Sequence, residues 1–394
     1  MLSACGQTAG RGTVWASPLT RLRPTMTESL EPSQARESSA QFSASASSGA
    51  PDTPDAPLAG VTVLDLTRLL PGPLAGLRLA ELGARVIKIE DKGAGDYARE
   101  MMLGESEAPP SAFWRLLNRG KAIERLDLKD DTDRATFREW VSRADVLLEG
   151  FRPGVMARLG FDYETLARLR PSLVMASITG YGQHGPMAQA AGHDINYIGY
   201  AGVLDQLGDT ADAPIVPNFQ IGDLYGGGQA TVQAVLAALV SALRTGRGRW
   251  LDISMTHEVF RANLIPAVAL HRQGHVSRAG TDLLNGGVPC YQVYRTQDGR
   301  HMAVGALELK FWQALCDVLG RNDWKSRHWS LGQVIGGADA RALQGELAAV
   351  FASASLADWT LRFANADCCV TPVLRLEEAM THPLFAQTRG SLTP

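Results

Sequence analysis

The stretch GVTVLDLTRLLPGPLAGLRLAELGARVIKIE, residues 60–90, decides the fold. Its first seven residues form an apolar run typical of a buried strand, and its last seven, ARVIKIE, form another. Between them, residues 71–83 predict a helix with Pro71 at its start and Gly83 at its end, which are the positions those residue types favour. A strand, a helix and a second strand in this order predict two parallel strands joined by a crossover helix.

The same pattern continues along the chain. Residues 144–150 (ADVLLEG) and 172–182 (SLVMASITGYG) read as further buried strands, each after an amphipathic segment. A long apolar helix is predicted at 230–246, followed by a strand at 248–255. The predicted fold class is therefore α/β, with a Rossmann-like large domain built on a parallel sheet. In such sheets ligands bind at the carboxyl ends of the strands.

A second, smaller domain is predicted beyond residue 282. Residues 286–306 read as two strands around an Asp-Gly turn, and helices are predicted at 307–320 and within 341–365. The predicted organisation is a disordered tail at 1–56, a large domain at 57–255, a linker helix region at 256–281 and a small α+β domain at 282–375. Residues 376–394 are expected to return towards the large domain, in a form that is cut short.

Composition narrows the classes of partner. With 45% hydrophobic and 20% charged residues, the 394-residue chain has an ordinary globular balance. The net charge of -3 and the lack of a long Lys/Arg run argue against nucleic acid. The longest apolar run, residues 232–243, is shorter than a membrane span requires, so no membrane partner is predicted.

Cysteine usage and the N-terminal residues bear on the compartment. The five cysteines are scattered without CxxC spacing, which favours a reducing compartment over a disulfide framework or a zinc site. We therefore expect a cytoplasmic protein. The first 27 residues carry three arginines and no acid, so a transit peptide and a mitochondrial location form the alternative.

Three short stretches offer acid or base candidates. They are AGHDINYIGYAG with His193 and Asp194, IGDLYGGG with Asp223, and the position of Glu308 just after HMAVGAL. Each has a structural alternative: His193 and Asp194 could cap a helix, Asp223 could be a turn residue, and Glu308 could be a first-turn acid. None of the four stands at helical metal-ligand spacing from another, so no metal site is predicted.

The glycines after Asp223 add a possible anion site. Gly226 and Gly227 are followed by Gly228 and then by the long predicted helix. We expect their backbone N–H groups to lie bare at the helix start, where an anion or an oxyanion could approach closely.

Several blocks of the chain resemble the class III CoA-transferase family, which includes the α-methylacyl-CoA racemases. The similar blocks run from about Leu58 to about Thr381; they include residues 57–90, RGKAIERLDLK, VLLEGFRPGVMARLG, ITGYGQHGP, AGHDINY, IGDLYGGG, LLNGGVPCY and HMAVGALE. The resemblance implies an acyl-CoA substrate, coenzyme A as part of that substrate, no other cofactor, and an interlocked homodimer of two-domain subunits.

The resemblance implies two sets of catalytic roles. In racemase-type members, residues at the positions of His193 and Asp223 lie on opposite faces of the acyl α-carbon, and one at Glu308 supports the histidine. In transferase-type members, the residue at Asp194 attacks the thioester and later holds CoA as an aspartyl thioester. The family's CoA-binding blocks contain Lys121, Arg152 and Arg158 for the phosphates, and Gly192, Tyr197, Gly226 and Gly227 nearer the thioester.

Two positions differ from the racemase pattern. The chain reads EDKGAGDYARE after the second strand, where racemases carry Arg-Pro, and it has Asn285 where racemases carry an Asp. The first prediction is racemisation of a 2-methylacyl-CoA by α-proton transfer. The alternatives are CoA transfer from an acyl-CoA to a carboxylic acid through Asp194, and acyl-CoA binding without turnover.

Overall fold

The computed structural model describes residues 55–101, 110–208 and 213–393. The predictions of a disordered tail and of a transit peptide therefore concern residues that lie almost wholly outside the described ranges.

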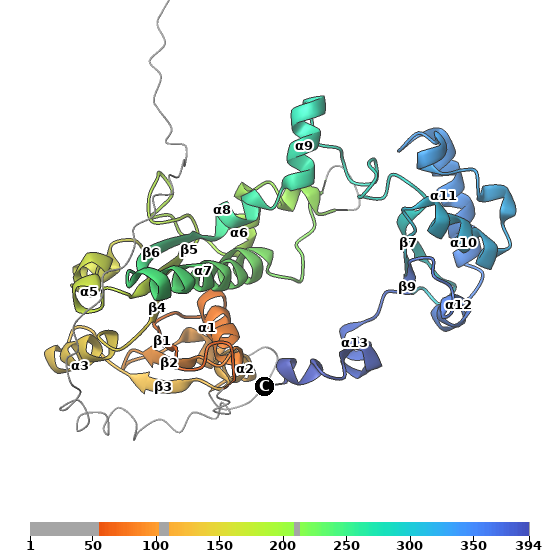
Figure 1. The fold of residues 1–394 in the computed structure, drawn as a ribbon. Helices are drawn as coiled ribbons and strands as arrows, with labels where there is room; N and C mark the ends of the chain where they lie inside the picture. The colour runs from red at the N-terminus through yellow and green to blue at the C-terminus, as the bar shows by residue number, and fades with distance from the viewer. Residues whose placement is uncertain (1–54, 102–109, 209–212, 394) are drawn as a thin grey trace, which may run out of the picture. The chain divides into compact units, whose positions relative to one another are not determined.

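A six-stranded parallel sheet forms the first part of the structure (Figure 1). Its strand order is β3-β2-β1-β4-β5-β6, and every neighbouring pair is parallel. The order reverses between β1 and β4, so the connections leave these two neighbours in opposite directions and a crevice opens at their carboxyl ends. The strands are β1 (Thr62–Asp65), β2 (Arg85–Glu90), β3 (Ala122–Arg125), β4 (Val146–Glu149), β5 (Val174–Thr179) and β6 (Arg249–Ser254).

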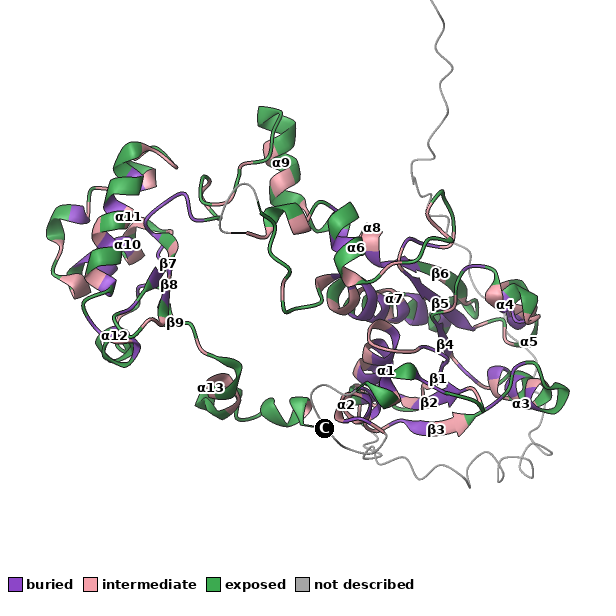
Figure 2. Ribbon diagram, turned by 180° about the vertical axis from the view of Figure 1, so that it is seen from behind, coloured by how far each residue is buried: buried purple, intermediate pink, exposed green. Residues whose placement is uncertain are grey.

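Burial explains why the central strands are mostly apolar. Every residue of β4 and β5 is buried, and Figure 2 shows the same burial across the middle of the sheet. Helices α1 (Pro71–Glu81) and α7 (Ala230–Thr245) contribute to one hydrophobic core with these strands. Since both faces are covered, alternation of apolar and polar residues is not expected in these strands.

The remaining helices of this part connect the strands. They are α2 (Ala112–Asn118), α3 (Asp131–Val141), α4 (Val155–Arg158), α5 (Tyr163–Leu169), α6 (Asp194–Tyr200), the π-helix η3 (Gly222–Gln229), α8 (Met255–Arg261) and α9 (Leu264–Gln273), with short 3₁₀ turns η1 (Tyr97–Glu100) and η2 (Leu204–Gln206).

A second hydrophobic core belongs to a three-stranded antiparallel sheet of order β7-β8-β9. Three tryptophans, Trp312, Trp324 and Trp359, are among the largest fully buried side chains in this core. The elements are β7 (Tyr291–Arg295), β8 (His301–Gly305), β9 (Val370–Pro372), α10 (Leu309–Leu319), α11 (Ala338–Phe351) and α12 (Leu356–Phe363); α13 (Leu376–Thr381) follows, with 3₁₀ turns η4 (Asn322–Trp324), η5 (Trp329–Leu331), η6 (Pro383–Phe385) and η7 (Arg389–Leu392).

The predicted fold class is confirmed by the parallel sheet and the smaller antiparallel one. The sequence did not reveal β3 or β9. Only Ala122 of β3 is buried, because β3 lies at the sheet edge and pairs with β2 alone, so it lacks an apolar run. The predicted domain limits and the homodimer stay predictions.

One continuous helix in the described ranges, Gly222–Thr245, is long and apolar enough to cross a membrane by length and composition alone. Half of its most apolar window is buried inside the protein, where α7 packs against the sheet. Such burial is typical of a core helix.

Candidate active site

A cavity of about 630 Å³ opens where three neighbouring strands end. The turn after β1 supplies residues 67–69 of its wall and the start of α1 supplies residues 71–72. The turn after β4 supplies residues 150–153, and the end of β5 supplies residues 178–181. The cavity therefore lies at the carboxyl edge of the sheet, beside the crevice between β1 and β4.

His193 lines this cavity. It is an exposed residue at the N-cap position of α6, and its backbone N–H donates to the Asn196 side chain (3.0 Å). The helix-cap alternative holds, because His193 and Asn196 form a capping box in which the imidazole faces the backbone N–H of Asn196. The ring also lines the cavity, where it can meet a ligand.

Tyr197 and two glycines shape the wall next to His193. The Tyr197 hydroxyl donates to the Gly192 carbonyl (2.5 Å), and its ring meets Tyr181 edge to face. A Cβ on Gly192 would lie 2.7 Å from the Tyr181 hydroxyl, and one on Gly180 would lie 2.3 Å from the Tyr197 ring. Both positions need glycine because the ring packs directly on the backbone.

Asp223 reaches the same cavity from the first turn of η3. Burial, together with the nearby Asp194 charge, raises the pKa of Asp223 to about 7. A carboxyl group with this pKa can both give and accept a proton near neutral pH.

Asp194 lies next to Asp223 rather than on the cavity lining. Its Oδ1 accepts a hydrogen bond from the backbone N–H of Asp223 (2.9 Å), which ties the start of α6 to the start of η3. The side chain is partly buried. Its carboxylate thus fixes the position of Asp223 and raises the pKa of that neighbour.

The glycine triplet has a packing role that differs from the predicted one. Gly226 and Gly227 are buried inside the π-helix η3, four and five residues after its first residue, and the helix runs on into α7. A Cβ on Gly226 would lie 2.6 Å from the Met255 carbonyl, and one on Gly227 would lie 2.5 Å from Pro71. The expectation of bare N–H groups at a helix start is therefore wrong: these glycines let α8 and α1 approach η3 closely.

The three predicted phosphate-binding cations have different surroundings. Arg152 lines the cavity and is exposed. Arg158, in the last turn of α4, is exposed but does not line this cavity. Lys121 is fully buried, and its ammonium donates to Asp65 (2.9 Å), the Pro73 carbonyl (2.8 Å) and Asn118 (3.1 Å). All three N–H donors of Lys121 are thus used inside the protein, which leaves none for a phosphate.

Glu308 belongs to the smaller antiparallel part. It is exposed at the N-cap position of α10 and does not line the cavity of this chain. Among the described residues, no group of three His, Cys, Asp or Glu side chains could hold a metal ion.

Sequence reasoning missed Arg68, Tyr97 and Phe151, which also line the cavity. Arg68 and Phe151 follow β1 and β4 within three residues. Their place directly after predicted strands was the available signal, since ligands bind at strand carboxyl ends.

Comparisons with known proteins agree on one family. A family model described as CoA-transferase family III matches residues 58–393. The chain is 35% identical over 336 residues to the alpha-methylacyl-CoA racemase of Homo sapiens, covering 85% of this chain and 82% of the racemase. It is 34% identical over 337 residues to the acetyl-CoA:oxalate CoA-transferase of Acetobacter aceti, covering 85% of each. A crystal structure of a CAIB/BAIF family protein from Brucella suis matches with a TM-score of 0.71 and 26% identity, over 83% of this chain and 86% of that one.

Proposed function

The chain belongs to CoA-transferase family III, enzymes that act on acyl-CoA, and on this premise we propose that it racemises a 2-methylacyl-CoA thioester by moving the α-proton. The chain is almost equally similar to the racemase of Homo sapiens, at 35% identity, and to the transferase of Acetobacter aceti, at 34% identity. The choice between the two reactions therefore depends on the site.

One observation carries the proposal: His193 and Asp223 line the same cavity, and the pKa of Asp223 is raised to about 7. They come from separate elements, the start of α6 and the start of η3. Inversion at a carbon needs one base and one acid on opposite faces, with proton affinities close to each other. A carboxyl group of ordinary acidity would remain ionised at neutral pH and could not serve as the acid.

In the proposed reaction, His193 removes the α-proton and the resulting enolate takes a proton from Asp223 on the other face. The reverse direction exchanges the two roles. A thioester α-proton is weakly acidic, so the enolate oxygen needs hydrogen-bond donors in place before the proton leaves.

Deuterium incorporation tests the proposal. Wild-type protein in deuterated water should place deuterium at the α-carbon of a 2-methylacyl-CoA. Both His193→Gln and Asp223→Asn should lose inversion by about a hundredfold or more. The two variants should still differ: each should exchange deuterium from one enantiomer only, because one base remains. Wild-type protein that binds the thioester and leaves the α-proton in place would overturn racemisation.

CoA transfer through Asp194 is the second candidate. It is favoured by the Gly95-Asp96 stretch after β2, which resembles transferases, and by the partly buried Asp194 carboxylate beside the cavity residue Asp223. In that reaction the carboxylate attacks the thioester carbonyl and releases CoA thiolate, which then attacks the mixed anhydride and frees the acyl carboxylate. The product on the protein is an aspartyl-CoA thioester.

Hydroxylamine separates the two candidates. Under transfer, it should convert Asp194 to a hydroxamate in the presence of acyl-CoA, and Asp194→Asn should abolish transfer to an added carboxylic acid. Under racemisation, no adduct should form. Tight acyl-CoA binding with both assays silent would support a protein that binds without turnover.

A further inference from the structure

The peptide bond between Gly192 and His193 is held at both of its polar groups. The Gly192 carbonyl accepts a hydrogen bond from the Tyr197 hydroxyl (2.5 Å), and the His193 N–H donates to the Asn196 side chain (3.0 Å). Asn196 and Tyr197 are neighbours in α6, the helix that His193 caps. Because a peptide group is planar, one hydrogen bond to its carbonyl and one from its N–H together fix its orientation. The backbone that carries the imidazole is therefore set by two side chains of α6.

Tyr197 is the more firmly held of these two side chains. It is 7% exposed, whereas Asn196 is an exposed residue. Its ring packs on Gly180, directly after β5, where an added Cβ would lie 2.3 Å from the ring, and it meets Tyr181 edge to face with centroids 5.4 Å apart. The Gly180 carbonyl in turn accepts from the N–H (3.0 Å) and the hydroxyl (2.7 Å) of Thr256. The Tyr197 hydroxyl is thus fixed relative to the carboxyl end of β5.

The Tyr197 hydroxyl acts as a donor to the backbone. Burial, followed by the nearby charge of Asp223, raises the pKa of Tyr197 above its ordinary value. The hydroxyl therefore keeps its proton throughout the neutral range. A tyrosine hydroxyl has a single proton to donate, and this one goes to the Gly192 carbonyl. Tyr197 can thus influence the chemistry through the position of His193 without itself giving a proton to the substrate.

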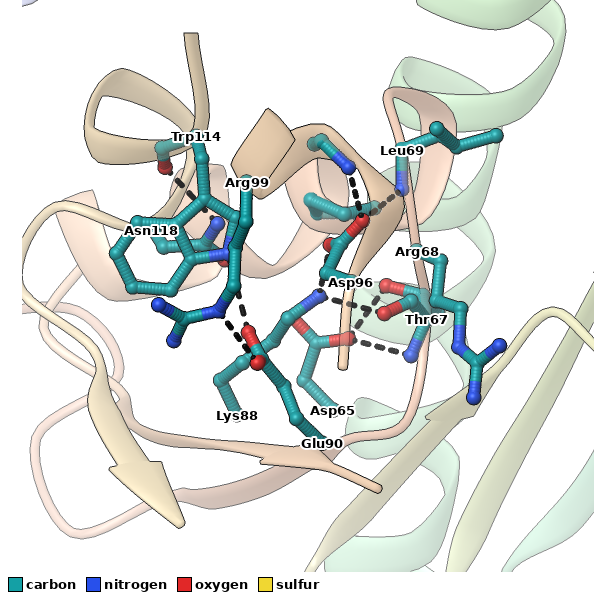
Figure 3. Close-up of polar contacts among 12 residues, drawn as sticks. Asp65, Thr67, Arg68, Leu69, Lys88, Glu90, Asp96, Arg99, Trp114 and Asn118 are labelled. Carbon is teal, nitrogen blue, oxygen red and sulfur yellow. Dashed lines mark hydrogen bonds and ion pairs between the residues drawn. The ribbon is translucent and has the colours of Figure 1, made fainter. Parts of the chain in front are cut away.

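Buried charges hold a different part of the cavity wall, the turn after β1 (Figure 3). There the Thr67 carbonyl accepts from the Lys88 ammonium (2.5 Å), the Leu69 N–H donates to Asp96 (2.9 Å), and Lys88 pairs with Asp96 (2.8 Å). Removal of either charged partner would leave the other charge buried and unpaired. At the Gly192 carbonyl the donor is neutral, so its hydrogen bond can be removed without such a cost.

We propose that Tyr197 is a positioning residue for His193, whose imidazole it directs towards the acyl α-carbon by holding the Gly192 carbonyl. This inference rests on the proposed function in taking His193 as one of two bases. Proton transfer needs the base within hydrogen-bond reach of the proton, and a misplacement of about 1 Å can cost about a hundredfold in rate. The other base, Asp223, has its own backbone contact, to Asp194 (2.9 Å). Loss of the Tyr197 hydroxyl should therefore affect the two bases unequally.

Deuterium exchange from each enantiomer of a 2-methylacyl-CoA tests this inference with Tyr197→Phe, which removes only the hydroxyl. Exchange should slow about ten- to a hundredfold for the enantiomer that His193→Gln fails to exchange, and stay within about twofold for the other. Asn196→Ala, which frees the N–H of the same peptide bond, should slow the same enantiomer. Calorimetry should give an unchanged affinity for the thioester, because the missing proton belonged to a backbone contact.

The matched control is Tyr294→Phe, in the smaller antiparallel part. The Tyr294 hydroxyl also donates to a backbone carbonyl five residues earlier, that of Pro289 (2.7 Å), and the side chain is also buried. Thermal unfolding should show a similar loss of stability in Tyr294→Phe and Tyr197→Phe. Tyr294→Phe should nevertheless exchange both enantiomers at the wild-type rate, which separates positioning from a general loss of stability.

The backbone N–H of His193 gives a readout that does not depend on catalysis. Without the Tyr197 hydroxyl the peptide bond can turn, so in Tyr197→Phe this N–H should exchange with deuterated water about tenfold faster than in the wild type or in Tyr294→Phe, as followed by NMR. An unchanged rate of this amide overturns the proposal. Equal slowing of both enantiomers also overturns it, since the whole site would then be disturbed. Wild-type protein that leaves the α-proton in place overturns racemisation alone, and the amide rates still decide whether Tyr197 holds His193.

Discussion

Asp223 shows how one carboxyl group couples the proposed chemistry to stability. Its pKa is raised from the ordinary 3.8 to about 7, so between these values the folded state holds a proton that the unfolded state has released. The free energy of unfolding therefore falls as the pH rises through this window.

Asp223→Asn should remove this pH dependence. The variant should match the wild type near pH 4 and become more stable by roughly 3–4 kcal/mol above pH 7, because it avoids the cost of the buried charge. Urea unfolding at pH 5 and pH 8 measures the difference. The exposed Asp205→Asn serves as control. A stability gain that is equal at both pH values would contradict the assignment.

For Lys121, the surrounding sequence suggested a contact with a CoA phosphate, but the structure buries its ammonium in an ion pair. Its partner Asp65 lies 56 residues away, and both side chains are fully buried. The block that contains Lys121 resembles a CoA-binding segment, yet its ammonium stabilises the end of β1 and the start of α1.

Lys121→Met should lower the free energy of unfolding by about 3–5 kcal/mol, because Asp65 is left buried without its cation. The folded fraction should bind CoA with unchanged affinity. Arg152→Gln, at an exposed position of the cavity wall, should do the opposite: weaker CoA binding at nearly constant stability. Urea unfolding and calorimetry on both variants measure the contrast. If Lys121→Met protein is stable and loses much of its CoA affinity, the lysine contacts CoA after all.

At the scale of elements, η3 is the segment where local sequence and packing disagree. Three consecutive glycines favour a loop, but they lie buried inside a helix that continues into α7. Their missing side chains are what the neighbours need: Pro71, Leu74 and Met255 would all clash with added Cβ atoms. The cost of helical glycine is outweighed by close packing against α1 and α8.

Two Gly→Ala variants separate packing from helix propensity. Gly227→Ala should destabilise the protein by about 1–3 kcal/mol, since its Cβ would lie 2.5 Å from Pro71. Gly345→Ala, in the exposed middle of α11 with nothing within 4 Å of the added Cβ, should stabilise it by about 0.5–1 kcal/mol. Thermal unfolding of both measures the contrast. A stabilised Gly227→Ala protein would show that α1 can move away at no cost.

At the scale of the whole molecule, α8 and α9 carry several large apolar side chains that are exposed. Phe260, Leu264, Ile265 and Val268 are each between 59% and 72% exposed, and α9 has no buried residue. Exposed apolar side chains that gather on one surface are a feature of protein interfaces. It fits the homodimer that the sequence resemblance implies.

We expect sedimentation to give twice the 42.3 kDa mass of one chain. Ile265→Arg with Val268→Arg should shift the protein towards the monomer, because two charges would have to be buried at the interface. Leu361→Arg, at an even more exposed position of α12, should leave the mass unchanged. A wild-type mass of one chain would remove the homodimer prediction.

The sequence by itself determined the α/β class, most strand positions and the three stretches with acid or base candidates. These features are visible in short stretches of sequence. Apolar runs of strand length indicate buried strands, and Pro71 and Gly83 mark the two ends of one helix. The sequence did not indicate β3, because its single buried residue gives no apolar run.

Only the tertiary structure decided which candidates meet. His193 and Asp223 line one cavity, and Arg68, in the turn after β1, lines it as well. Lys121 is instead fully buried. The glycine triplet likewise changed from a predicted anion site to a packing surface. The physical reason is the same in each case. Burial and pairing depend on residues tens of positions apart, whose proximity is set by packing of the whole sheet and its helices.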